Sequence, residues 1–431
     1  MANPHTYKHI PALRFPEFQN DGEWEMKRLG EIAIRVNNKN KSDAQHPVLT
    51  NSSTEGIVNQ QDYFDREIVT RDNLKNYSIV EVDDFVYNPR ISTAAPVGPI
   101  SRNKIGLGIM SPLYTIFRFK EGNIDYFEHY FKTNCWHQYL KDIANFGARF
   151  DRMNITSEDF MNLPIPFPPL AEQKRIAECL SSVDKMIAEC NNKLELLKSH
   201  KKGLMQQLFT PPHYRCKQLI INVLQIPRLR FPEFNDTKEW EIKKLGEIFD
   251  RLANRNKVNN QNVLTISAQH GLVSQYDYFN KNVAANDVTN YYLISRGDFA
   301  YNKSRSQGHP FGAIKALRKY ETGIVSPLYI CFRAKDDNCN VDFYEFYFDT
   351  DLINDEMGKI AQEGARNHGL LNISNDDFFN RINILTPSDS EQRKIADCLS
   401  SLDETIRLYN DKLTVLRHHK RGLMQQLFPQ A

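Results

Sequence analysis

Two stretches of the chain carry its strongest hydrophobic pattern. Apolar residues recur there at alternating spacings of four and three, which is the 3.5-residue period of a coiled-coil seam. The first stripe comprises Ile176, Leu180, Val183, Ile187, Cys190, Leu194, Leu197, Lys201, Leu204 and Leu208. The second comprises Ile395, Leu399, Leu402, Ile406, Tyr409, Leu413, Leu416, Lys420, Leu423 and Leu427. Prolines stand before and after each stretch, so the pattern predicts two bounded helices, each about 57 Å long.

These helices could bury their stripes in two ways. Each could pack on its own domain, or the two could pair. Pairing would bury most of the seam positions at about 1.5 to 3 kcal/mol per fully buried Leu or Ile, which favours it. A parallel pair would require the segment between the helices to bridge about 57 Å, whereas a compact body of that length is about 40 Å across. We therefore predict an antiparallel intramolecular coiled coil with one domain at each end.

The remaining segments predict mixed structure. Short runs of β type occur at 79–87, 113–119 and 328–332, and helical stretches occur at 126–143 and 343–361. Turns rich in Asn, Gly and Ser separate them. The predicted fold class is α+β, with two globular domains of mixed α and β structure separated by the two long helices.

The chain also repeats itself at about half its length. The hexapeptide at 13–18 returns at 229–234 with an offset of 216, and 172–209 aligns with 391–428 without a gap, with 23 of 38 residues identical. Residues 88–93 and 302–307, in contrast, differ freely. The repeat predicts a pseudo-two-fold scaffold with different inserts, divided into a first domain (1–168), a first helix (169–213), a second domain (214–388) and a second helix (389–431).

Composition narrows the class of protein. The 431 residues are 41% apolar, so proper cores are expected, and the seven cysteines form no CxxC pair. Neither a membrane-spanning stretch nor a signal core is visible, which predicts a soluble protein of the reducing cytoplasm. Charge is nearly balanced, with 55 basic and 53 acidic residues, so any contact with nucleic acid must depend on local charge.

Motifs for catalysis are missing from the sequence. It contains no GxxxxGK[ST] phosphate loop and no HExxH or HxH spacing, and it predicts no metal site. The paired carboxylates Asp83-Asp84 and Asp376-Asp377 adjoin expected strand or helix starts, which favours a turn or cap role. An unrecognised nuclease or methylase site remains an alternative.

The closing segments carry a family resemblance. Residues 168–177, Pro-Pro-Leu-Ala-Glu-Gln-Lys-Arg-Ile-Ala, run through the heptad helix to Lys-Lys-Gly-Leu-Met-Gln-Gln-Leu-Phe at 201–209. This region closely resembles the conserved region of specificity subunits of type I restriction-modification enzymes. The second copy is similar, although Ser388-Asp389-Ser390 replaces the Pro-Leu-Ala entry. The openings at 13–18 and 229–234 are also similar to that family.

The resemblance implies a DNA-reading subunit without an active site of its own. Two target recognition domains would each read one half of a bipartite, asymmetric DNA sequence. The conserved helices would set the spacing and dock two methyltransferase subunits. Those partners would bind S-adenosylmethionine, no cofactor would bind this chain, and motor-nuclease subunits would complete the complex. The alternative is a coiled-coil adaptor that organises protein partners without sequence-specific DNA binding.

Candidate DNA contacts are sought in loops because neither domain is basic overall. The side chains of Arg, Asn and Gln can form two hydrogen bonds with the edge of one base, whereas those of Lys, Ser and Thr mostly bind phosphates. In the first domain the candidates are Arg35, Asn37, Asn38, Lys39, Lys41, Arg90, Ser92, Thr93, Arg149 and Arg152. In the second they are Arg251, Asn254, Arg255, Lys257, Asn302, Lys303, Arg305, Gln307, His309, Arg366 and His368. The loops after Asn88 and Asn302 are preferred, because there the repeat keeps a strand and changes the residues after it.

Two further features bear on assembly. The basic helix tails at 198–202 and 417–421 could form a solvated flank or touch phosphates or a partner. The repeat also predicts that the end of the second helix approaches the segment near Leu13, so that the chain is nearly circular. A half-chain of residues 1–213 should then pair with itself and read a palindrome.

Overall fold

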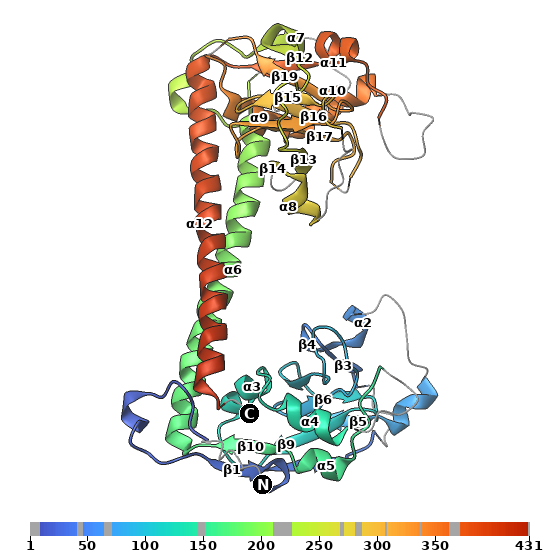
Figure 1. The fold of residues 1–431 in the computed structure, drawn as a ribbon, viewed down its shortest axis with the longest axis vertical. Coiled ribbons are helices and arrows are strands. Elements are labelled where there is room, and N and C mark those ends of the chain that lie inside the picture. The colour runs from blue at the N-terminus through green and yellow to red at the C-terminus, as the bar shows by residue number, and fades with distance from the viewer. Residues whose placement is uncertain are drawn as a thin grey trace. The chain divides into compact units, whose positions relative to one another are not determined.

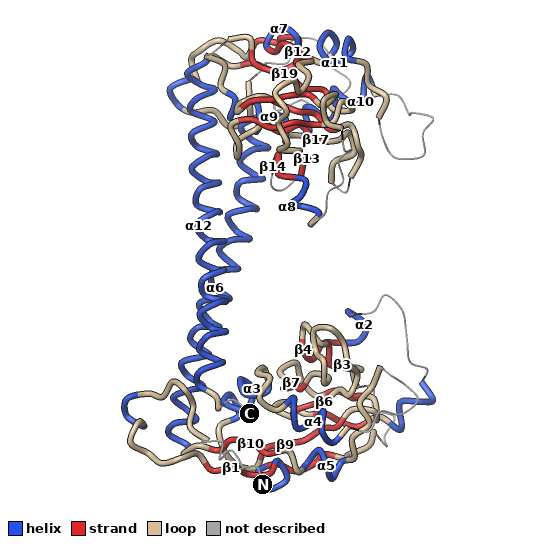
Figure 2. Tube along the Cα trace, in the orientation of Figure 1, coloured by secondary structure: helices blue, strands red, loops and turns tan. Residues whose placement is uncertain are grey.

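The computed structural model describes residues 9–40, 46–63, 71–144, 151–209, 226–267, 271–280, 287–306, 308–336, 338–361 and 371–429 (Figures 1 and 2). The chain forms two compact units, each of which takes one globular part and a portion of each long helix. Unit 1 comprises residues 1–191 and 411–431, and unit 2 comprises residues 192–410.

Unit 1 is built on a four-stranded antiparallel sheet in the order β2-β9-β6-β7. Three two-stranded pairs, β1 with β10, β3 with β4 and β5 with β8, accompany it. The strands are β1 (Glu25–Arg28), β2 (Ala33–Val36), β3 (Leu49–Ser52), β4 (Gly56–Asn59), β5 (Ser78–Val80), β6 (Phe85–Tyr87), β7 (Ile100–Arg102), β8 (Gly108–Met110), β9 (Thr115–Phe119) and β10 (Pro164–Phe167). The helices are α1 (Leu29–Ile32), α2 (Gln60–Tyr63), α3 (Ile124–Phe131), α4 (His137–Ile143), α5 (Ser157–Met161) and the first part of α6 (Leu170–Phe209), with short 3-10 turns at Pro16–Phe18 and Arg71–Asn76.

Unit 2 repeats this plan with the sheet order β12-β19-β16-β17 and the pairs β11 with β20, β13 with β14 and β15 with β18. The strands are β11 (Glu241–Lys244), β12 (Phe249–Leu252), β13 (Leu264–Ser267), β14 (Gly271–Ser274), β15 (Tyr292–Ser295), β16 (Phe299–Asn302), β17 (Ala313–Ala316), β18 (Thr322–Val325), β19 (Ile330–Ala334) and β20 (Asn383–Thr386). The helices are α7 (Leu245–Ile248), α8 (Gln275–Phe279), α9 (Val341–Phe348), α10 (Asp351–Ile360), α11 (Asn375–Arg381) and the first part of α12 (Asp389–Leu427), with a 3-10 turn at Pro232–Phe234. The α+β prediction is confirmed.

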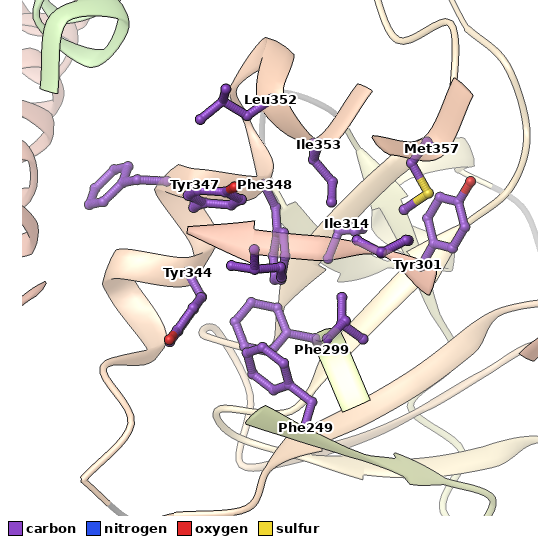
Figure 3. Close-up of a cluster of buried hydrophobic side chains, with 14 of the residues drawn as sticks. Phe249, Phe299, Tyr301, Ile314, Tyr344, Tyr347, Phe348, Leu352, Ile353 and Met357 are labelled. Atoms are coloured by element: carbon purple, nitrogen blue, oxygen red, sulfur yellow. The ribbon is translucent and has the colours of Figure 1, made fainter. Parts of the chain in front are cut away.

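Each core is an aromatic layer between the sheet and the helix after it. In unit 2, Phe299 stacks on Phe332 of the neighbouring strand at a ring separation of 5.2 Å. Phe249 packs edge-on against both rings, and Figure 3 shows Phe249 beside Phe299. In unit 1, Phe85 and Phe117 form the matching pair at 5.7 Å. The same strand register therefore places the same aromatic pair in both units, as the sequence repeat requires.

The long helices pair in antiparallel fashion, as predicted. In unit 1 the start of α6 meets the end of α12, where Lys420 reaches Asp184 at 2.5 Å. In unit 2 the end of α6 meets the start of α12, where Lys201 reaches Asp403 at 2.6 Å. Every seam position is buried or half-buried, so the stripes face each other through these contacts. The helices begin and end between the prolines that were expected to bound them.

The end of each helix also completes a core. Leu427 and Phe428 are fully buried in unit 1, where the Phe428 ring lies 5.4 Å from that of Tyr126. Leu208 and Phe209 are buried in the same way in unit 2, with Phe209 5.4 Å from Phe343. The far end of one repeat therefore belongs to the core of the other.

The repeated opening segment is held to the start of its helix by a buried ion pair. The Arg14 guanidinium donates two hydrogen bonds to Glu172 at 2.7 and 2.8 Å, and the Trp24 indole donates a third at 3.1 Å. In the second repeat, Arg230 likewise donates two hydrogen bonds to Glu391, at 2.8 and 2.7 Å. Removing one partner of such a pair leaves a buried charge without compensation, which is strongly destabilising.

Three of the expected elements are divided in the structure. The run at 79–87 is two strands, β5 and β6, because Asp83 takes the left-handed conformation with φ 71° between them. The stretch at 126–143 breaks into α3 and α4, where the Thr133 hydroxyl donates to the carbonyl of Tyr130. Thr350 does the same to Tyr347 in the stretch at 343–361, which separates α9 from α10.

Candidate DNA-recognition surface

Two equivalent loops come after the central strands β6 and β16. We name them the 88–98 loop and the 302–312 loop. Each begins at an asparagine and ends at a glycine with positive φ, Gly98 (82°) and Gly312 (81°). A Cβ atom at either glycine would lie 2.0 or 2.1 Å from the carbonyl oxygen of that asparagine, so a larger residue would force the loop open.

The same bonds brace both loops. The Tyr87 hydroxyl donates to the Val97 carbonyl at 2.9 Å, and the Tyr301 hydroxyl donates to the Phe311 carbonyl at 2.7 Å. Burial raises the pKa of both tyrosines well above its usual range, so their hydroxyls stay protonated. The side-chain oxygen of Asn302 accepts the Ser304 amide at 3.1 Å, as Asn88 does with Arg90. Asn302 therefore shapes its loop, which the base-contact prediction had not anticipated.

The structure brings the 88–98 loop together with the segment of unit 1 that contains the predicted candidate Arg152. The Ile91 amide donates to the Asp151 carbonyl and the Met153 amide donates to the Pro89 carbonyl, both at 3.0 Å. Arg90 and Arg152 form a β-bridge between these segments. Arg90, Ser92 and Thr93 are exposed, and Arg152 is half-buried. Two arginines from distant parts of the chain thus stand side by side.

Unit 2 has a related arrangement with different side chains. The Leu371 amide donates to the Lys303 carbonyl at 3.1 Å, which joins the 302–312 loop to the segment ahead of α11. Arg305 is exposed, His309 is half-buried, and burial lowers the pKa of Lys303. Loops of equal length on equal supports therefore present different chemistry.

The candidates after β2 and β12 divide into two groups. Lys39 donates to the Asn76 carbonyl and the Ser78 hydroxyl, both at 3.1 Å, and Arg255 stacks on Tyr292 at 4.7 Å. These two side chains are thereby held within their own domains. The other described candidates of this group are exposed: Arg35, Asn37, Asn38, Arg251, Asn254 and Lys257. Lys41, Arg149, Gln307, Arg366 and His368 lie outside the described residues.

The paired carboxylates have the turn and cap roles that the sequence favoured. Buried Asp84 accepts the Glu81 amide at 2.8 Å and pairs with Arg118 at 2.6 Å. Asp377 lies in the first turn of α11, where hydrogen bonds from Ser374 and Arg381 lower its pKa. Among the described residues no group of His, Cys, Asp or Glu is placed to hold a metal ion, and no described helix could span a membrane.

Sequence comparison identifies the family. The family model described as "Type I restriction modification DNA specificity domain" matches residues 21–198 and 237–418, and so covers both repeats. The chain belongs to this family.

Known members of the family resemble the chain over all or part of its length. The type I restriction enzyme MjaVIII specificity subunit of Methanocaldococcus jannaschii is 22% identical over 98% of this chain and 95% of its own. The MjaIX specificity subunit of the same organism is 27% identical over 37% of this chain and 34% of its own. The crystal structure of a type I restriction-modification S subunit from M. genitalium superposes with a TM-score of 0.54, at 13% identity, over 98% of this chain and 100% of that one. That structure shares the fold.

Sequence reasoning missed one basic surface of this family member. Arg102 on β7, Lys104 after it and Lys132 after α3 line a single groove in unit 1 together with Arg417 and Arg421 of α12. These residues come from separate stretches of the chain and have no common spacing. Only the basic tail at 417–421 carried a signal in the sequence.

Proposed function

We propose that this chain is the non-catalytic DNA-reading subunit of a type I restriction-modification complex. Each globular part would read one half of a bipartite, asymmetric DNA sequence. The observation that carries the proposal is the match between the 88–98 and 302–312 loops, which have the same length, the same asparagine start and the same glycine end. Their exposed side chains differ, as two readers of unlike half-sites require.

The residues that would read bases are the exposed ones at these loops. Arg90 and Arg305 can each donate two hydrogen bonds to guanine in the major groove, and Ser92 and Thr93 can hold phosphates. Arg152 would support Arg90 from the neighbouring segment. The side-chain oxygen of Asn302 accepts the Ser304 amide and so shapes the loop. The residues after Asn302 would therefore read the bases in unit 2.

Two methyltransferase subunits would dock on the long helices. Leu196 of α6 and Val415 of α12 occupy equivalent positions in the repeat, 219 residues apart, and each is 66% exposed. Exposed apolar side chains mark a contact with another protein where several of them gather, and the same helices also expose Met186 in unit 1 and Leu408 in unit 2. Exposed apolar residues on the long helices of both units, including one pair at equivalent repeat positions, support two copies of the same partner. Those partners would supply S-adenosylmethionine and the methyl transfer, and motor-nuclease subunits would add cleavage.

The test is copurification with candidate methyltransferase subunits, followed by sequencing of the methylated DNA. We expect an adenine-methylated motif with two unlike halves and a fixed spacer. Copurification without sequence-specific methylation would instead support the adaptor alternative. Methylation or cleavage by the purified chain alone would contradict a non-catalytic subunit.

A further inference from the structure

Unit 1 contains a groove of about 950 Å³ between the last turns of α12 and the recognition domain. One wall is α12, with Arg417, Lys420 and Arg421. The opposite wall is formed by β7 and the segment after α3, with Arg102 and Lys132. The β3–β4 turn at 52–56 closes one side with Ser53 and Thr54, whose side chains are exposed.

The lining contains more basic than acidic residues. It contains six Lys or Arg residues and two carboxylates, Glu55 and Glu128. Burial by itself would raise the pKa of Glu128, but hydrogen bonds and charges from Lys104 and Lys132 outweigh it and bring the pKa to about 2. That carboxylate is therefore fully ionised and already shared by two lysines. Arg102 is paired in turn with Asp83 at 2.6 Å and with Asp125 at 2.5 Å, so the basic residues of this wall are balanced by carboxylates.

The charge on α12 is the part that remains available. The Lys420 ammonium already forms an ion pair with Asp184 at 2.5 Å. Arg417 and Arg421 are exposed, lie one helical turn apart on the groove side, and form no ion pair within the part of the chain that the structure describes. Two guanidinium groups at this spacing can each hold a phosphate.

The groove adjoins the loop that would read bases. Ala94, Ala95 and Gly98, which belong to the second half of the 88–98 loop, form part of its lining. A duplex contacted by Arg90 and Thr93 would therefore present its backbone to the groove. The hydroxyl groups of Ser53 and Thr54 are further donors of the kind that bind phosphate oxygens.

We propose that this groove binds the phosphate backbone of double-stranded DNA beside the half-site read by unit 1, with Arg417 and Arg421 as phosphate ligands. The inference rests on the proposed function and adds a positioning contact to it. Phosphate contacts carry no base information, so the groove sets affinity and salt dependence and leaves the preferred sequence unchanged.

The repeat offers a matched control in unit 2. Lys198 and Lys202 of α6 occupy the positions of Arg417 and Arg421, with an offset of 219. The wall residues that correspond to Lys132 and Arg102 are Asp349 and Ala316. Asp349 binds Lys315 at 2.6 Å. The helix charges are thus repeated in unit 2, but the basic residues of the opposite wall are not.

The experiment compares R417A/R421A with K198A/K202A in the full chain assembled with its methyltransferase subunits. The dissociation constant for a short duplex carrying the methylated motif is measured over a series of salt concentrations. We expect R417A/R421A to reduce the slope of log K against log salt by about 1.8, or about 0.9 for each lost phosphate contact. K198A/K202A should keep the wild-type slope, and R417K/R421K should restore most of it.

The proposal would be overturned by an unchanged slope in R417A/R421A, by an equal loss in K198A/K202A, or by a changed base preference in selection sequencing with R417A/R421A. Loss of the methyltransferase subunits from R417A/R421A, with DNA binding retained, would also overturn it and would identify the groove as a site for an acidic protein segment. Failure of the proposed function looks different, because the wild-type complex would then select no sequence at all.

Discussion

At the scale of single residues, the two units differ where one repeat position holds unlike side chains. His129 on α3 is buried, and its Nε2 atom lies 3.0 Å from the Ser181 hydroxyl on α6. The equivalent residue in unit 2 is Phe346, with the Lys201 ammonium over its ring at 4.8 Å. Burial lowers the pKa of His129 to about 4, and the charges of Lys132 and Lys420 act in the same direction. The contact between His129 and Ser181 in unit 1 is therefore sensitive to pH through the imidazole. Phe346, at the equivalent position in unit 2, does not titrate.

Replacing His129 by Phe should remove this sensitivity. A histidine whose folded pKa lies below its unfolded value of 6.5 stabilises fully above pH 6.5, and this contribution is lost as the pH falls toward 4. Between about pH 7 and pH 5, we expect the contribution of His129 to lower the free energy of unfolding of the wild-type chain by about 2 kcal/mol. This decrease should be absent from H129F. The nearby carboxylates Asp184 and Glu128 oppose the shift, and their effect is included in the pKa of about 4.

Thermal unfolding midpoints at both pH values measure this difference. Exposed His200 on α6 provides the control, because H200F should keep the wild-type pH dependence. An equal pH dependence in H129F and the wild type would show that His129 is not the responsible group.

At the scale of elements, the two reading loops show how one support can carry two specificities. The tyrosine before each loop, the asparagine that begins it and the glycine that ends it are the same in both units. The residues between them can differ, because their side chains are not required by the core. A change of sequence in the loop can therefore change the DNA that is read while the sheet below it stays as it is.

Replacing Arg305 by Ala should alter base preference in one half-site only. Loss of a guanidinium that bonds a guanine costs about 1–3 kcal/mol and relaxes selection at that base. R90A is the matched variant in unit 1, and it should relax the other half. Selection sequencing of both variants measures the effect, and an unchanged preference in R305A would remove the 302–312 loop from the recognition surface.

At the scale of the whole molecule, the contacts between the repeats are exchangeable. Lys420 meets Asp184 in unit 1, and Lys201 meets Asp403 in unit 2, and these residues correspond to each other with the offset of 219. The Leu13 amide donates to the Gln426 carbonyl at 2.9 Å, and the Leu229 amide donates to the equivalent Gln207 carbonyl at 3.0 Å. Each unit therefore accepts the helix end of the other repeat through the same set of bonds.

A half-chain of residues 1–213 should accordingly form a homodimer. Lys201 of each copy would meet Asp184 of the other, and Phe209 would fill the place that Phe428 takes beside Tyr126. We expect a dimer by light scattering and, with methyltransferase subunits, methylation of a palindrome built from the first half-site. K201D should weaken this dimer because it places two aspartates together. A monomeric half-chain would show that the two repeats are not interchangeable.

A circular permutant should also assemble. The bond from Leu13 to Gln426 brings the last turn of α12 beside the opening segment. We expect a chain that joins Ala431 to Met1 and opens within 211–226 to keep its methyltransferase subunits and its DNA motif. Copurification and methylome sequencing measure both properties. A permutant that folds but no longer assembles would contradict the near-circular arrangement.

The sequence alone determined the long helices, their antiparallel pairing and the repeated α+β scaffold. A heptad stripe and a duplicated motif are local or periodic patterns, so they can be read from the order of residues without coordinates. The preference for the loops after Asn88 and Asn302 came from the same comparison. Whether those loops touch bases stays a prediction.

Which of the polar candidates are held within their own domains depends on contacts that form in the folded chain. Lys39 and Arg255 looked like Arg90 in the sequence, but contacts with Ser78 and Tyr292 tie them to the scaffold. The divided run at 79–87 depends on the left-handed turn at Asp83. The groove of unit 1 unites segments around β7 and α3 with the last turns of α12, which lie far away along the chain. Such contacts join segments that share no spacing, so they arise from the folded arrangement and leave no pattern in the sequence.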